Sequence, residues 1–498
     1  MEKRGTALLV DKLLARPGLM VAAFAAAQCF FWTLAPALSH DAPPLDVVES
    51  YLWGHEWVVG TFKHPNMPGW VLEASRQLTG AVGWPAYLAS QLFVAATFAA
   101  AFQLGRETMD GARALAGTLL LAGVFYFAWP TVEFNHNVAQ MPFWAVIALM
   151  VWRQRTHASL IGWVLLGLIA AVSLYAKLSS GLLLLVAGLW ILWDAPLRRQ
   201  LAQPAPWLGL LVFLIASLPL LNWLAGSHFS PLLYAAERSE GTAQGPLQFL
   251  GAQVLACLGL IGLAAVSGLV GQSREAGSRG PPRPDRQTLT FLAVMTLAPM
   301  LLTALAAIAL GAGLKSMWGS PMFGLAGLLT VALTSPRVTN RALWRLVLAV
   351  GVLLVTLPAG YAIDTAFEAR LTGKPKRQNW PQAEIAARFD RIWRGQTGRP
   401  LRIVAGERWI AGLAALRPGP MPSILTDGNL ALSPWITEAR LHEDGALVIW
   451  EMKAASDRPP AALAGRIRGR PLATEQFNLP RFPNAKPLLI GYAIVPPG

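Results

Sequence analysis

Residues 45–70, LDVVESYLWGHEWVVGTFKHPNMPGW, follow the first long apolar segment of the chain, so we expect them just outside a membrane. Acidic and basic side chains lie at the two ends of this stretch, and aromatic side chains lie between them. This pattern favours a site for a charged, partly lipidic substrate. The side chains concerned include Asp46, Glu49, Tyr51, Lys63 and His64.

The composition of the chain is that of a membrane protein. Of its 498 residues 54% are hydrophobic and 14% are charged, whereas an average soluble protein has about 25% charged residues. Several apolar runs reach the roughly 20 residues that a helix needs to cross a bilayer. We therefore predict a mainly α protein, a polytopic transmembrane helix bundle with about 11 spans. The expected spans are residues 18–38, 84–104, 112–129, 137–153, 160–176, 180–194, 206–225, 247–271, 288–312, 318–334 and 342–362.

The net charge of +14 does not indicate nucleic-acid binding, because the basic residues cluster in short loops between the apolar runs. Loops on one side of the predicted bundle hold 17 Lys and Arg residues, including those of the linker 273–287, and loops on the other side hold five. The basic side of a membrane protein is usually cytoplasmic. We therefore expect a cytoplasmic N-terminus and, after an odd number of spans, a C-terminus on the outer side.

The chain divides into two expected domains. Residues 1–363 form the transmembrane domain, with a first outer loop at 39–83, and residues 364–498 form a small outer α/β domain. Residues 383–393 are amphipathic and predict a helix. Residues 401–405, 423–425, 446–450 and 487–495 predict strands.

Asp46 and Glu49 are three residues apart and share a face if this stretch is helical. One interpretation is an ordinary acidic helix N-terminus, since Pro43 and Pro44 precede them and acids favour the helix dipole there. The other is that one carboxylate acts as a general base on an acceptor hydroxyl or amine, while the second orients the acceptor or holds a metal or another cation.

Basic and aromatic residues of the outer loops form a second candidate group. Lysines at a membrane edge are often interfacial anchors, yet a Lys also binds phosphate as a point charge. The candidates for binding an anion are Lys63, His64, Lys177, Lys315 and Trp318.

The second outer loop, TVEFNHNVAQM at residues 131–141, is also polar. It is either a turn between two helices or the remaining wall of a polar pocket. Its candidate side chains are Glu133, Asn135, His136 and Asn137.

Taken together, these motifs resemble membrane glycosyltransferases of the GT-C fold, in the bacterial family-39-like branch related to protein O-mannosyltransferases and lipid A aminoarabinose transferases. The resemblance runs from residue 17 to near the C-terminus. Its motifs are the first-loop acids with His64-Pro65-Asn66, then Asn135-His136-Asn137, Lys177-Leu178-Ser179 and Trp318-Gly319-Ser320-Pro321, and the tail stretch VAGERWIAGLAALRPG.

The resemblance implies an inverting transferase. It would move a sugar from a polyprenyl-phosphate donor to a lipid, lipopolysaccharide or protein acceptor on the periplasmic face of the bacterial inner membrane. No cofactor is required; a divalent metal is possible, but no ligand cluster in the sequence supports one. Two departures from the family pattern matter: valines separate Asp46 from Glu49, and Asn137 replaces a second-loop acid, which makes Glu133 a possible substitute.

The alternative function from another class is a lipid or sugar transporter or flippase. Such a protein needs polar residues along the midplane of the bundle and broken helices. The sequence has few charges inside the predicted spans and places the candidate acids and lysines in the outer loops, which favours chemistry at the membrane surface.

Overall fold

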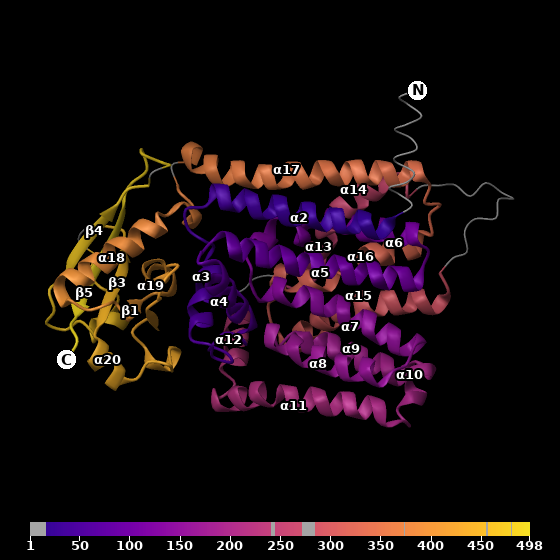
Figure 1. Cartoon of the computed structure of the whole chain (residues 1–498), viewed down its shortest axis with the longest axis horizontal. Helices are drawn as coiled ribbons and strands as arrows, with labels where there is room; N and C mark the ends of the chain where they lie inside the picture. Colours follow the sequence, from indigo (N-terminus) through magenta and orange to yellow (C-terminus); the bar gives the residue numbers. More distant parts are fainter. Residues whose placement is uncertain (1–15, 241–244, 271–283, 373, 455–456, 480) are drawn as a thin grey trace.

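The structure is a computed structural model that describes residues 16–240, 245–270, 284–372, 374–454, 457–479 and 481–498. It has two parts, a bundle of long, roughly aligned helices and a small domain at one end of that bundle (Figure 1). Of the predicted basic linker 273–287, residues 273–283 lie outside the described residues.

The bundle contains most of the predicted spans as helices. Its main helices are α2 (Pro17–Ser39), α5 (Trp84–Thr108), α6 (Gly111–Leu120), α7 (His136–Thr156), α8 (Leu160–Ala176), α9 (Ser180–Trp193), α11 (Pro204–Gly226), α13 (Pro246–Ala256), α14 (Leu258–Val266), α15 (Arg286–Leu310), α16 (Ala326–Thr334) and α17 (Asn340–Thr372). The connecting elements include α3 (Leu45–His55), α4 (Met67–Thr79), α10 (Ala195–Gln200), α12 (Ser230–Glu240), η1 (Leu121–Gly123), η2 (Phe125–Phe127), η3 (Trp129–Val132), η4 (Ser316–Phe323) and η5 (Arg377–Asn379).

In the described part of the chain, six helices are long and apolar enough to cross a membrane, or up to eight if each bent pair counts as one span. The bent pairs are Gly111–Gly123 with Phe125–Val132, and Ser316–Phe323 with Ala326–Thr334. Helices α8 and α9 are apolar but shorter. The structure thus confirms a multi-pass helical protein, and the number of 11 spans stays a prediction.

Close helix packing in the bundle depends on glycines at two crossings. A Cβ atom on Gly167 of α8 would lie 2.0 Å from the carbonyl oxygen of Gly209 on α11, and one on Gly327 of α16 would lie 1.9 Å from that of Gly117 on α6. Small residues allow such backbones to approach closely in membrane helices.

The small domain is built on a five-stranded sheet in the order β2-β1-β3-β5-β4. Its strands are β1 (Ile403–Gly406), β2 (Ser423–Thr426), β3 (Ala446–Met452), β4 (Ala473–Phe477) and β5 (Leu488–Val495). Strand β1 is parallel to β2 and β3, whereas β5 is antiparallel to β3 and β4. The four predicted strands are present. Strand β4 was not predicted, because its residues are mostly exposed and lack an apolar pattern.

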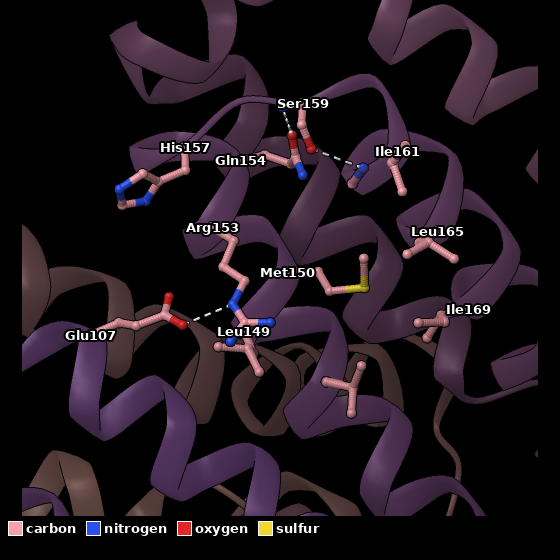
Figure 2. Close-up of a pocket in the computed structure, with 12 residues that line it drawn as sticks. Glu107, Leu149, Met150, Arg153, Gln154, His157, Ser159, Ile161, Leu165 and Ile169 are labelled. Atoms are coloured by element: carbon pink, nitrogen blue, oxygen red, sulfur yellow. Dashed lines mark hydrogen bonds and ion pairs between the residues drawn. The ribbon is translucent and has the colours of Figure 1, made fainter.

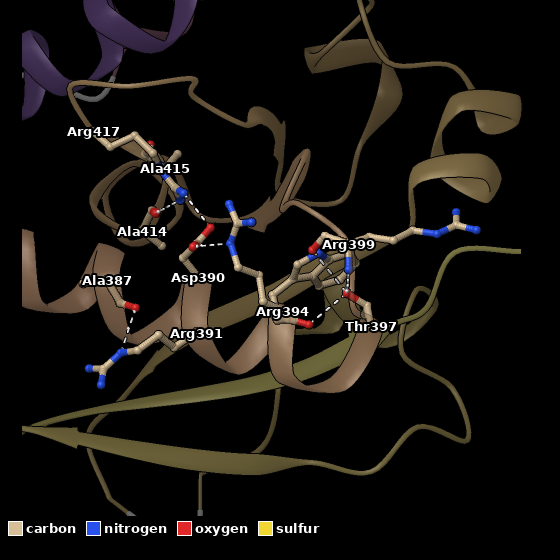
Figure 3. Close-up of polar contacts among 10 residues, drawn as sticks. Ala387, Asp390, Arg391, Arg394, Thr397, Arg399, Ala414, Ala415 and Arg417 are labelled. Atoms are coloured by element: carbon tan, nitrogen blue, oxygen red, sulfur yellow. Dashed lines mark hydrogen bonds and ion pairs between the residues drawn. The ribbon is translucent and has the colours of Figure 1, made fainter. Parts of the chain in front are cut away.

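Helices α18 (Gln382–Thr397), α19 (Arg408–Ala415), α20 (Glu438–Asp444) and α21 (Ala461–Ala464) and the turn η6 (Leu430–Leu432) complete this domain. The predicted amphipathic helix corresponds to α18. Asp390 of α18 pairs with Arg394 at 2.6 Å and with Arg417 at 2.7 Å, which links α18 to the segment after α19 (Figure 3).

The small domain docks on the end of the bundle where α3 and α4 lie (Figure 1). Arg76 of α4 donates to the carbonyl oxygens of Pro418 and Gly419, at 2.5 and 2.9 Å. Arg481 pairs with Asp41 at 3.0 Å. Helix α17 continues to Thr372, so the helical part extends past the predicted boundary at 363/364.

Candidate functional site

The candidate site lies at the end of the bundle that carries the small domain, where α3 begins. Pro44 precedes α3 and Asp46 is in its first turn. The backbone N–H of Asp46 donates to Oε1 of Glu133 at 3.1 Å, and Nδ2 of Asn135 donates to Oδ2 of Asp46 at 3.2 Å. The structure thus brings the first-loop acid and the second outer loop together.

Asn135 fixes this contact through helix α7. It is the N-cap of α7, and its Oδ1 accepts the backbone N–H groups of Asn137 and Val138 at 2.9 and 3.3 Å. A capped helix start holds the Asn135 side chain in one orientation. Its remaining amide nitrogen is therefore directed at Asp46.

Among the described residues Glu49, unlike Asp46, forms ion pairs with basic side chains. It is buried at 3% exposure, and both of its carboxylate oxygens accept from Nζ of Lys63 at 2.8 Å. Nε of Arg408, from the small domain, lies 3.2 Å from Oε1 of Glu49. Burial raises the pKa of Glu49, and the positive charges of Lys63 and Arg408 oppose that rise. Glu49 therefore joins the two domains.

This pairing changes the expected role of Lys63. Its ammonium also lies 5.6 Å from the ring centroids of Trp53 and Tyr234. Burial lowers the pKa of Lys63, while Glu49 raises it. In the structure Lys63 therefore neutralises a buried carboxylate, and its binding of an anion stays a prediction.

The rings of the two histidines contact each other at an interplanar angle of 46°. The rings of His64 and His136 are 4.4 Å apart, and Nε2 of His136 lies 2.9 Å from the carbonyl oxygen of Pro65. Burial and nearby positive charges lower the pKa of His64 well below its usual range. A neutral His64 does not attract a phosphate by charge, and the contacts of the pair pack the His-Pro turn against the start of α7.

Lys177 lies between α8 and α9. Its Nζ donates to Oδ1 of Asn137 at 2.6 Å and lies 5.9 Å from the ring centroid of Trp318. Burial lowers the pKa of Lys177 to about 8, and the charge of Asp46 opposes this shift. Lys177, Asn137 and Trp318, which come from three separate segments, therefore meet in the structure.

Lys315 precedes η4 and also interacts electrostatically with Asp46. Burial lowers the pKa of Lys315, the charges of Arg238 and Lys63 lower it further, and Asp46 raises it. Asp46 thus lies among cations from three elements of the bundle. Such an arrangement provides a carboxylate beside positive charge, as reactions that release an anion require.

Glu133 contacts Asp46, whereas Tyr51 lies in the apolar core. Burial and the charge of Asp46 raise the pKa of Glu133 to about 8. Glu133 is therefore mainly protonated at neutral pH. Tyr51 is fully buried at 0% exposure in the apolar core. It follows Asp46 by five positions, which turns it about 140° around the helix axis and away from Asp46.

Among the residues that the structure describes, no group of three or more His, Cys, Asp or Glu side chains is arranged to hold a metal ion. The acids and histidines of the site contact Asn, Lys, Arg, aromatic and backbone groups.

Arg408 is a site residue that the sequence analysis did not assign. It belongs to the tail stretch noted for its family resemblance, but nothing in the local pattern connects it with Glu49. Tyr234 of α12, which packs on Lys63 and His64, was missed for the same reason. Only the docking of the small domain and the course of α12 bring these residues to the site.

The structure thus combines a bundle of apolar helices with a cluster of acids and cations at one end. Comparison with known families specifies the class. Residues 63–223 match the family described as dolichyl-phosphate-mannose-protein mannosyltransferase, a GT-C type family. This match confirms the resemblance to GT-C glycosyltransferases and implies a membrane glycosyltransferase activity.

The matched region contains Lys63, His64, the second outer loop and Lys177. It does not include Asp46, Glu49, the η4 segment or the small domain. No curated protein matches the chain.

Proposed function

We propose that this protein is an inverting glycosyltransferase that moves a sugar from a polyprenyl-phosphate donor to an acceptor on the periplasmic face of a bacterial inner membrane. The acceptor class is an envelope glycan, a lipid or a protein. In this proposal the N-terminus is cytoplasmic, and the small domain lies in the periplasm above the site. The positive-inside pattern and the family match support this assignment.

One observation carries the mechanism: in the described chain Asp46 forms no ion pair, whereas Glu49 forms two. A base must have a carboxylate that is free to accept a proton. Asp46 meets this condition at the mouth of the bundle. Glu49 does not, because two cations already occupy its oxygens.

The reaction then proceeds as one displacement. Asp46 accepts the proton of the acceptor hydroxyl or amine while that atom forms a bond to the anomeric carbon of the sugar. The bond from this carbon to the lipid phosphate oxygen breaks, and the phosphate leaves with the electron pair. The ammonium groups of Lys177 and Lys315 stabilise the charge that develops on it.

Asn135 orients the base, and a protonated Glu133 beside Asp46 avoids the repulsion of a second charge. Glu49, Lys63 and Arg408 hold α3 in place. Lys63 and His64 therefore have a supporting role in the proposed mechanism, and the donor phosphate lies on the side of Lys177.

The experiment that tests the function is deletion of the gene, followed by mass spectrometry of cell-envelope glycans, lipids and proteins. We expect one envelope component to lose one sugar. Expression of the wild-type protein should restore that sugar, and the Asp46→Asn variant should not. An unchanged envelope, or full restoration by Asp46→Asn, would contradict the proposal.

A further inference from the structure

A second candidate site lies at the opposite end of the bundle, between the end of α7 and the start of α8. It is a cavity of about 490 Å³, within the range of small-molecule sites. Figure 2 shows the residues that line it. The site described above contains none of them.

The lower wall of this cavity is apolar. It is formed by Leu149, Met150, Leu165 and Ile169. This wall is continuous with side chains on the outer surface of the bundle, since Ile161 is 71% exposed and Leu165 is 43% exposed. In a multi-pass membrane protein such a surface faces lipid, so the cavity opens toward the bilayer.

The upper end of the cavity offers hydrogen-bond donors. Arg153 uses Nε to pair with Glu107 at 2.7 Å, and no contact of its terminal guanidinium nitrogens is found among the described residues. Gln154 is 2% exposed, and its Oε1 accepts the backbone N–H of Ser159 at 2.9 Å. Its amide nitrogen is left as a donor at the cavity (Figure 2).

Gly162 keeps this polar end open. A Cβ atom there would lie 1.7 Å from Nε2 of Gln154. His157 adds a further ring nitrogen at the rim. The polar end therefore presents mainly N–H groups, which complement the phosphate and ester oxygens of a lipid, above an apolar wall that complements its acyl chains.

We propose that this cavity binds an anionic phospholipid of the leaflet at the basic end of the bundle. The phosphate lies against Arg153 and the amide of Gln154, and the acyl chains lie along Leu165 and Ile169. Basic pockets between membrane helices are known to bind anionic headgroups. The Glu107 carboxylate pairs with Arg153 from one side, which fixes the guanidinium and leaves its other edge to the lipid.

The test uses the full chain in nanodiscs that contain equal amounts of phosphatidylglycerol and phosphatidylethanolamine. After extraction into detergent, native mass spectrometry counts the lipids that remain bound. We expect about one phosphatidylglycerol to be retained in preference to phosphatidylethanolamine. One Arg near a membrane surface contributes roughly a fivefold preference for anionic lipid. Arg153→Gln should therefore reduce the preference by about that factor.

Two matched controls separate this site from general lipid contact. Arg106→Gln removes an exposed charge at the same end of the bundle that does not line the cavity. Leu165→Trp fills the apolar wall, whereas Leu168→Trp changes a residue of the same helix that is also 43% exposed but lies outside the cavity. We expect loss of bound lipid with Leu165→Trp and wild-type retention with both controls.

Equal lipid retention in the wild type and in Arg153→Gln would overturn the proposal, as would an equal loss in Arg106→Gln. If inorganic phosphate displaced the lipid as well as added phosphatidylglycerol does, the acyl chains would not contribute and a lipid site would be refuted. Because only lipid retention is measured, the outcome does not depend on the proposed transferase activity.

Discussion

The contact between Lys177 and Asn137 leads to a testable pH dependence. Burial lowers the pKa of Lys177 to about 8, so this ammonium is mainly charged below pH 8 and loses its charge as the pH rises further. At pH 7 about nine-tenths of the molecules hold the charge, and at pH 9 about one-tenth do. If the charge binds the donor phosphate, kcat/KM for the donor falls about tenfold for each pH unit above 8.

The variant that tests this pH dependence is Lys177→Arg, because an Arg side chain stays charged throughout the pH range of the assay. We expect this variant to have a lower kcat/KM at pH 7, since a guanidinium does not fit the geometry of Lys177, Asn137 and Trp318. Combined with Glu133→Gln, which removes the second group that titrates in this range, Lys177→Arg should nevertheless abolish the alkaline decrease or move it to higher pH. Lys177→Ala should lose most donor use at every pH.

Glu133 titrates in the same range and must be separated from Lys177. Burial and Asp46 raise the pKa of Glu133 to about 8, so it gains a negative charge as the pH rises through 8. This charge also repels a phosphate. Glu133→Gln removes that effect and should keep the decrease that is due to Lys177.

The assay measures kcat/KM between pH 6 and 10 with protein in liposomes and the donor below saturation, once the envelope comparison has identified the donor. The pH dependence of kcat/KM reports the pKa values of ionisable groups in the free enzyme. Wild-type kinetics in Lys177→Ala, or an alkaline decrease in Lys177→Arg combined with Glu133→Gln that coincides with the wild type, would refute the role of Lys177.

Further predictions concern the base, the orientation and the small domain. Asp46→Asn should lower kcat by about 10²–10⁴-fold, the usual effect of losing a general base. Donor binding, measured as donor that copurifies with the detergent-extracted protein, should stay intact, and turnover at the wild-type rate would exclude Asp46 as the base. Glu49→Gln should instead lower the melting temperature, because it leaves the buried Lys63 without its carboxylate partner; an unchanged melting temperature would contradict its supporting role. A phosphatase fused after Gly498 should be active and one fused within 273–287 inactive; the reverse pattern would overturn the orientation. Arg408→Gln should make the small domain more accessible to protease, visible as faster cleavage by gel electrophoresis; cleavage at the wild-type rate would argue against this contact.

Much of the fold follows from local pattern. Apolar runs of sufficient length predict the helices of the bundle, and they do so because a bilayer requires each backbone to satisfy its own hydrogen bonds. Strands β1, β2, β3 and β5 were also predicted, since their buried residues form short apolar runs. Strand β4 was missed because it is an exposed edge of the sheet.

Most residues of the candidate site could be predicted from the sequence, but the contacts between them could not. The acids, Lys177 and the Asn residues of the second outer loop stand out as polar groups beside apolar runs. The sequence does not show that Lys63 pairs with Glu49 and Lys177 with Asn137. The pairing of Lys63 with Glu49 depends on the turn after α3, which brings the two side chains together. The second cation of Glu49, Arg408, reaches it only through the docking of α19.

The position of Arg408 affects how the protein is made. The ribosome completes every membrane helix before it reaches Arg408, and the proposed topology then requires this segment to cross the membrane and fold. Until that happens, Glu49 lacks one of its two cations. In a nascent chain that has inserted its helices but has not exported its last domain, Glu49 of α3 pairs with Lys63 alone. Export of the last domain therefore completes the ion pairs that hold α3 against it.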